Sequence, residues 1–163
     1  MQPIGRKAPG FSLPDQKGNV HKLSDYLGQY VLLYFYPKDD TPGCTVEACS
    51  MRDMLPNFKK IKCKVFGISV DSVESHKDFA KKHKLTFTLL SDEKKKVVEK
   101  YGVWKERSMY GKKFMGTVRA SYLIDPKGKI VRVYEKVKPE THADEVLADL
   151  MALRQESKLS LVK

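Results

Sequence analysis

Two cysteines five positions apart lie where the sequence predicts the start of a helix. Cys44 follows an apolar run and a polar turn, and the segment Thr41-Pro42-Gly43 leads directly into it. The first N–H groups of a helix are unpaired, and its N-terminus carries a partial positive charge. Both effects favour the thiolate of a cysteine in the first turn, and the thiolate is the nucleophilic form. The position therefore predicts a reactive Cys44, with Cys49 as a second sulfur in the same helix.

The cysteine and histidine content favours redox chemistry over a metal site. The chain has three cysteines and four histidines. Zinc takes four such ligands, usually in closely spaced pairs, whereas the histidines here are scattered, at His21, His76, His83 and His142. We expect these histidines at the surface or at helix caps, and no metal ligand set among them. The odd number of cysteines also argues against a structural disulfide framework.

Composition and charge indicate a single globular domain that spans residues 1–163. The chain is 41% hydrophobic and 31% charged, and no apolar run approaches the roughly 20 residues of a membrane span. The N-terminus has no apolar signal-peptide core, so we expect a cytoplasmic protein with no membrane partner. The net charge is +11. Because the lysines are spread over the chain and form no basic stripe, we expect no nucleic-acid partner.

Apolar runs, caps and turn residues predict alternating strands and helices. The predicted strands cover residues 11–13, 19–23, 30–36, 63–71, 86–90, 118–125 and 129–137. The predicted helices cover residues 24–27, 43–55, 72–85, 91–101 and 141–156. The long helix should end or kink near Leu55, because Pro56 disfavours helical geometry at the residue before it. The run at residues 30–36 is apolar without alternation, which is typical of a strand buried on both faces, and residues 63–71 read as a second buried strand.

This order of elements predicts an α/β, thioredoxin-like fold. A mixed central sheet would be flanked by helices and preceded by an N-terminal β extension. Residues 103–116 read as an irregular loop or a short ribbon, and residues 155–163 as a frayed tail. Cys44 would follow the carboxyl end of a central strand, where the ligand sites of open α/β sheets gather.

Several segments match the motifs of a known family. Pro37, Thr41 and Cys44 fit the pattern P-x3-T-x2-C, and the segments YGVW, MYGKK and MGTVRASYLID narrow the match, as does the spacing to Cys49. From about residue 3 to 153 the chain resembles the peroxiredoxins, in particular the bacterioferritin-comigratory-protein or PrxQ subfamily. The resemblance implies a monomeric, thioredoxin-dependent thiol peroxidase without a cofactor, acting on hydrogen peroxide and organic hydroperoxides. It implies that Cys44 is the peroxidatic and Cys49 the resolving cysteine, with Thr41, Pro37 and Arg119 completing the pocket.

The chemistry of each pocket residue suits the role that the resemblance implies. Arg119 is permanently charged and can stabilise both the thiolate and the developing charge on the leaving oxygen. The Thr41 hydroxyl can donate to the thiolate and accept from the peroxide. Pro37 has no N–H and fixes its own backbone, which shapes the loop. A charge in an apolar strand is costly without a partner, so we also expect Arg119 to pair with Glu47 or Asp53.

The spacing of Cys44 and Cys49 has a mechanical consequence. In an intact helix, residues five apart have Cα atoms roughly 8.6 Å apart, beyond the limit of about 7 Å for a disulfide. The two sulfurs therefore cannot join unless the helix between them unwinds. We predict a folded reduced state and a locally unfolded oxidised state.

Other assignments stay open at this point. Cys63, at the head of a predicted buried strand, is a small core residue or else a resolving cysteine that displaces Cys49. A thiol–disulfide oxidoreductase on the same fold is an alternative function, although that chemistry usually relies on C-x2-C at a helix start. A basic nucleic-acid-binding or holdase-like protein is the alternative from another functional class.

Overall fold

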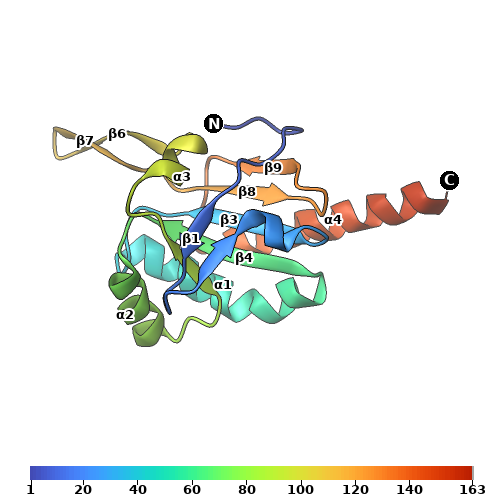
Figure 1. Cartoon of the computed structure of the whole chain (residues 1–163), viewed down its shortest axis with the longest axis horizontal. Helices are drawn as coiled ribbons and strands as arrows, with labels where there is room; N and C mark the ends of the chain where they lie inside the picture. Colours follow the sequence, from blue (N-terminus) through green and yellow to red (C-terminus); the bar gives the residue numbers. More distant parts are fainter. Residues whose placement is uncertain (163) are drawn as a thin grey trace.

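A five-stranded mixed sheet forms the centre of the molecule (Figure 1). The computed structural model describes residues 1–162; Lys163, the last residue of the tail predicted to fray, lies outside the described residues. The strands are ordered β5 (Thr88–Ser91), β4 (Cys63–Ser69), β3 (Tyr30–Phe35), β8 (Ala120–Ile124) and β9 (Ile130–Tyr134). β3, β4 and β5 run parallel, whereas β8 is antiparallel to β3 and β9 to β8. This is the mixed, thioredoxin-like sheet predicted from the sequence.

The two faces of the sheet bury separate clusters, because successive side chains of a strand point to opposite faces. On β3, Leu32 and Tyr34 pack with residues of α1 (Pro42–Lys60), α2 (Val73–His83) and α4 (His142–Val162). Val31 and Leu33 pack on the other face with α3 (Lys96–Lys100) and with the segment of β1 (Ser12–Pro14). All of β3 after Tyr30 is buried. Because β3 is buried on both faces, its sequence does not alternate between apolar and polar residues.

Helix α1 is longer than predicted, because it continues through Pro56 to Lys60. The prediction that it would end or kink near Leu55 was wrong about its length. A proline inside a helix loses one backbone hydrogen bond, but the turn that follows Pro56 places Phe58 in the core, where it is fully buried. Burying a phenylalanine contributes about 1.5–3 kcal/mol, which offsets much of the cost of the proline.

The remaining elements refine the sequence-based predictions. β1 pairs with β2 (Val20–Lys22), and a 3-10 turn, η1 (Leu23–Tyr26), follows. The segment predicted as a loop or short ribbon is a two-stranded ribbon of β6 (Trp104–Met109) and β7 (Lys112–Thr117). α3 begins five residues later than the predicted cap at Ser91. α4 passes the predicted end at Glu156 and continues to Val162.

The register of β3 and β8 explains how distant residues meet. Phe35, the last residue of β3, pairs with Ala120, the first residue of β8. Because the strands are antiparallel, the residue before Ala120 lies beside the loop that follows Phe35. Arg119 is that residue, and the loop leads into α1 and Cys44. Sheet pairing thus joins positions 75 residues apart in the sequence.

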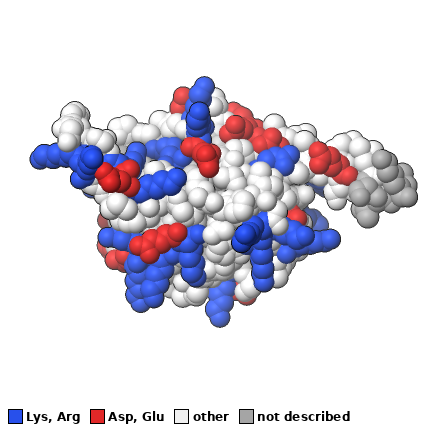
Figure 2. Space-filling view, turned by 90° about the horizontal axis from the view of Figure 1, so that it is seen from above, with Lys and Arg blue, Asp and Glu red and all other residues white. Residues whose placement is uncertain are grey.

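Figure 2, which views the molecule from above the orientation of Figure 1, shows lysines and arginines distributed across this side, with acidic side chains between them. Within residues 1–162, no helix is both long enough and apolar enough to cross a membrane.

Candidate active site

Cys44 lies in the first turn of α1 and is 1% exposed. Thr41 is the N-cap residue and Pro42 occupies the first helical position, where the missing N–H of proline costs nothing. The helix begins regularly, since the Thr45 N–H donates to the Thr41 carbonyl at 2.8 Å. Cys44 is thus the third residue of the helix, in the first turn where backbone N–H groups are unpaired, as predicted from the sequence.

Arg119 joins the sulfur to a carboxylate. Its Nη2 donates to Cys44 Sγ at 3.3 Å, and its Nη1 donates to Glu47 Oε1 at 2.7 Å. Gly43 permits this approach, because a Cβ atom at that position would lie 3.0 Å from Arg119 Nη2. Burial acts to lower the pKa of Arg119, but the charges of Glu47 and Cys44 outweigh it and raise that pKa. The guanidinium is thus a permanent positive charge between two acidic groups.

Glu47 is the ion-pair partner of Arg119, and it is deeply buried. Glu47 is 1% exposed, and its Oε2 has no hydrogen-bond partner among the described residues. Burial raises the pKa of this carboxyl from 4.5 to about 7, and Arg119 only partly opposes the rise. Of the two partners expected for Arg119, Glu47 is the one found; Asp53 instead pairs with Arg52 at 2.9 Å.

Thr41 and Pro37 belong to the same loop. Pro37 is half-buried just after β3, and the Thr41 hydroxyl donates to the Lys38 carbonyl at 2.9 Å. Because its hydrogen is used in this bond, the Thr41 oxygen is left as an acceptor. The structure thus brings Cys44 and Arg119 together beyond the end of β3, with Thr41 at the N-cap of the helix and Pro37 at the base of the loop.

A buried network that the sequence-based prediction missed anchors this loop. Asp39 accepts from Tyr36 at 2.6 Å and from Ser75 at 2.8 Å, and it contacts His76 Nδ1 at 2.7 Å. His76 is fully buried on α2, and its Nε2 faces the Leu90 carbonyl at 3.0 Å. The prediction that the histidines lie at the surface or at caps was wrong for His76. The available signal was its place three residues before Phe79 on one helical face.

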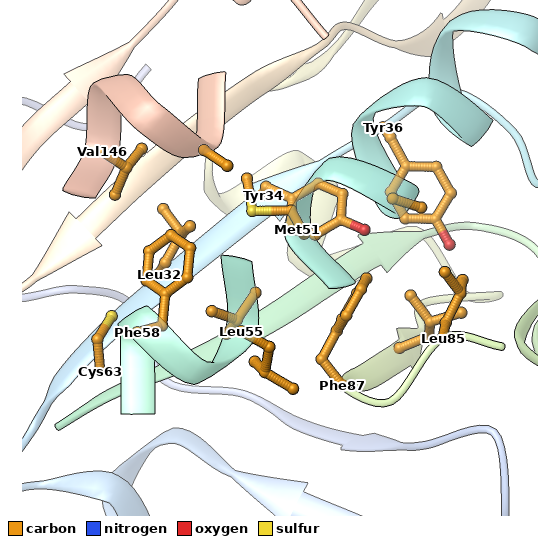
Figure 3. Packing of buried hydrophobic residues seen from close by; sticks show 14 of the residues in the cluster. Leu32, Tyr34, Tyr36, Met51, Leu55, Phe58, Cys63, Leu85, Phe87 and Val146 are labelled. Atoms are coloured by element: carbon orange, nitrogen blue, oxygen red, sulfur yellow. The ribbon is translucent and has the colours of Figure 1, made fainter. Parts of the chain in front are cut away.

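The other two cysteines have different surroundings. Cys49 is half-buried within α1, and none of the cysteines forms a disulfide within residues 1–162. Cys63 pairs with Tyr30 at the opposite end of β3 from the Cys44 loop. Figure 3 shows Cys63 beside Phe58, at the far side of the cluster from Tyr36. Burial raises the pKa of the Cys63 thiol to about 12.

Comparisons with known proteins agree with this geometry. The model of the AhpC/TSA family matches residues 4–133. The protein named Peroxiredoxin Bcp from Escherichia coli (strain K12) is 51% identical over 149 residues, covering 90% of this chain and 96% of that protein.

Solved structures show the same similarity. A cysteine-to-serine mutant of PrxQ from Xylella fastidiosa superposes with a TM-score of 0.90 at 37% identity, covering 94% of this chain and 98% of that one. The bacterioferritin comigratory protein of Xanthomonas campestris, whose alkyl peroxide reduction was studied with trapped complexes, gives a TM-score of 0.83 at 40% identity. That match covers 87% of this chain and 90% of that one.

Proposed function

Since the chain belongs to the AhpC/TSA family and is a thiol peroxidase of the peroxiredoxin type, we propose that Cys44 attacks the hydroperoxide. The observation that carries this assignment is the hydrogen bond of 3.3 Å from Arg119 to the Cys44 sulfur, at the start of a helix. A fixed positive charge and a helix N-terminus both stabilise the thiolate that peroxide reduction requires.

In the first step the Cys44 thiolate attacks the nearer peroxide oxygen in line with the O–O bond. An S–O bond forms, the O–O bond breaks, and the departing oxygen leaves with the electron pair and takes up a proton. Arg119 stabilises the negative charge that develops on that oxygen, and the Thr41 oxygen accepts from the peroxide O–H. The product on the enzyme is a sulfenic acid, the reversible level of cysteine oxidation.

In the second step Cys49 condenses with the sulfenic acid and water leaves. Cys49 lies in the same helix, half-buried, whereas Cys63 lies at the opposite end of β3 with a pKa of about 12. A thiol that keeps its proton at neutral pH is a poor nucleophile. These two facts support Cys49 as the resolving cysteine.

The resulting disulfide is reduced by a dithiol protein of the thioredoxin type, and the substrates are hydrogen peroxide and organic hydroperoxides. The alkyl peroxide reduction activity of the Xanthomonas campestris relative supports the second substrate class. We further propose that the enzyme works as a cytoplasmic monomer. Analytical ultracentrifugation of the reduced and the oxidised protein tests the monomer; a stable dimer in both forms would contradict it.

Peroxide consumption coupled to thioredoxin and thioredoxin reductase tests the assignments. Cys44→Ser should abolish consumption, Cys49→Ser should allow one turnover only, and Cys63→Ser should keep full turnover as the matched control. Mass spectrometry of the oxidised wild type should find the Cys44–Cys49 disulfide. If Cys63→Ser stops recycling while Cys49→Ser does not, the resolving assignment is wrong.

A further inference from the structure

One guanidinium serves two acidic groups in this site. Arg119 donates through Nη2 to Cys44 and through Nη1 to Glu47, and both acidic residues are 1% exposed. Two negative charges beside a single positive one, away from water, are unfavourable, so ionisation of one group opposes ionisation of the other. The proton balance of Glu47 must therefore depend on the chemical state of Cys44.

The unpaired oxygen of Glu47 points to the same conclusion. Oε2 is buried and has no hydrogen-bond partner among the described residues, and the hydroxyl of Tyr34 is likewise buried and unpaired there. Burying an ionised carboxylate whose oxygen has no hydrogen-bond partner is energetically unfavourable, whereas the protonated carboxyl is neutral and costs less to bury. The neutral form is thus favoured wherever Arg119 is engaged by another anion.

The other titratable groups around Arg119 keep one protonation state near neutral pH, so only Glu47 and Cys44 can change theirs. Tyr34, from β3, stays neutral, because burial first and Glu47 second raise its pKa well above the ordinary value. Arg119 stays charged. His142, at the start of α4, is neutral near pH 7 because burial lowers its pKa, and the charge of Arg119 acts in the same direction.

We propose that Glu47 holds a proton while Cys44 is a thiolate and gives it up when Cys44 becomes a sulfenic acid. Glu47 is then a positioning and proton-holding residue, since it acts through Arg119 and does not touch the peroxide. This inference rests on the proposed attack by Cys44.

The protons and electrons of this step balance. Before attack the site holds a Cys44 thiolate and a neutral Glu47 carboxyl; afterwards it holds a neutral sulfenic acid and a Glu47 carboxylate paired with Arg119. The sulfur loses two electrons to the peroxide, whose leaving oxygen departs as an alcohol or as water with one added proton. Glu47 releases one proton and the leaving oxygen takes up one. The wild-type enzyme therefore exchanges no net proton with solvent in this step.

Proton uptake during a single oxidation distinguishes this exchange from a purely structural role. We would use the Cys49→Ser protein, which stops at the sulfenic acid, in weakly buffered solution with an indicator dye, from acidic to alkaline pH. Where Cys44 is a thiolate and its sulfenic acid is neutral, uptake is near one proton below about pH 7, where Glu47 keeps its proton in both states, and also at higher pH, where Glu47 has no proton in either state. Just above neutrality the curve should show a minimum near zero. Adding Glu47→Gln to the Cys49→Ser protein should keep proton uptake near one per sulfur across this pH range. Adding Glu93→Gln, at an exposed position, is the control and should leave the minimum in proton uptake unchanged.

Infrared difference spectra of the same oxidation give a second readout that needs no Glu47 variant. A band of a protonated carboxyl should disappear when peroxide is added just above neutral pH. If the proton-uptake curves of the Cys49→Ser protein and of its Glu47→Gln derivative overlap, the inference is wrong. If the Glu47→Gln derivative does not fold, the infrared spectrum decides, and an unchanged carboxyl band on oxidation overturns the inference. Mass spectrometry keeps the two hypotheses apart: without a sulfenic acid on Cys44 the proposed function fails, whereas oxidation with identical proton curves refutes only the role of Glu47.

Discussion

Glu47 is a carboxyl group whose ionisation opposes folding. Its pKa is raised by burial to about 7 from 4.5, so between these pH values the native state keeps a proton that the unfolded state has released. The free energy of unfolding therefore falls as the pH rises through this window. Each pH unit corresponds to about 1.4 kcal/mol, which gives a loss of about 3 kcal/mol.

Glu47→Gln should remove that loss. Urea unfolding at a series of pH values, in a Cys44→Ser background that removes the ionising thiol, gives the comparison. The protein with Glu47 should lose stability relative to the glutamine variant from about pH 4.5 to 7. Parallel curves would show that Glu47 ionises in the native state as it does in the unfolded chain.

Arg119 is expected to act on the chemical step. Removing one donor that stabilises a developing charge costs roughly 100- to 1000-fold in rate, so Arg119→Met should slow the oxidation of Cys44 by about that factor. Stopped-flow fluorescence with limiting peroxide measures this rate. Arg154→Met, on an exposed part of α4, is the matched control and should react like the wild type. A loss of less than tenfold would place the transition-state charge elsewhere.

At the scale of elements, α1 carries both sulfurs of the proposed disulfide, so forming that disulfide requires the helix to change shape in each cycle. The helix is continuous from Pro42 to Lys60, so the two Cα atoms are held roughly 8.6 Å apart, too far for a disulfide. Hydrogen exchange should therefore show protection over residues 43–53 in the reduced protein and loss of it in the disulfide form. Oxidised Cys49→Ser, which has no disulfide, should stay protected. Equal protection in both redox forms of the wild type would contradict local unwinding.

Pro56 weakens the middle of the same helix. It is exposed and lacks the N–H that would bond to the Arg52 carbonyl. Pro56→Ala restores that bond, which stabilises the folded helix by about 3 kcal/mol. The same change gives the unfolded chain more conformational entropy, which costs about 1 kcal/mol. We therefore expect the free energy of unfolding to rise by about 2 kcal/mol. Disulfide formation should become slower, because a more stable helix unwinds less often. Pro42→Ala, where no bond is lost, should show no such gain in urea unfolding; equal gains would refute this account.

The sequence was most informative where a residue type has one dominant structural meaning. The unalternating run of β3 and the charge of Arg119 led to the correct sheet and to the contact between Arg119 and Cys44. The expected donation from Thr41 to the Cys44 sulfur is not found, because the Thr41 hydroxyl donates to the Lys38 carbonyl. The sequence was least informative where distant packing decides. Phe58 carries α1 through a proline, and His76 is buried because Asp39 from another loop faces it. Local propensity contains no information about either partner.

At the scale of the whole molecule, the net charge of +11 should act on protein partners and not on the substrate. Hydrogen peroxide is uncharged, whereas an acidic thioredoxin is attracted over distances comparable to the Debye length. Raising the salt concentration should thus lower kcat/KM for an acidic thioredoxin and leave the rate of Cys44 oxidation unchanged. Stopped-flow kinetics of each half-reaction measures the two effects. A salt-independent reductive step would show that the charge does not steer the partner.

The burial of Cys63 has a consequence for the fidelity of the cycle. Three cysteines permit three intramolecular disulfides, and exchange among them requires a thiolate to attack an existing S–S bond. With its pKa raised to about 12, Cys63 supplies almost no thiolate at neutral pH. While Cys63 stays buried, this protects the proposed Cys44–Cys49 disulfide from shuffling, so that a single isomer is presented to the reductant.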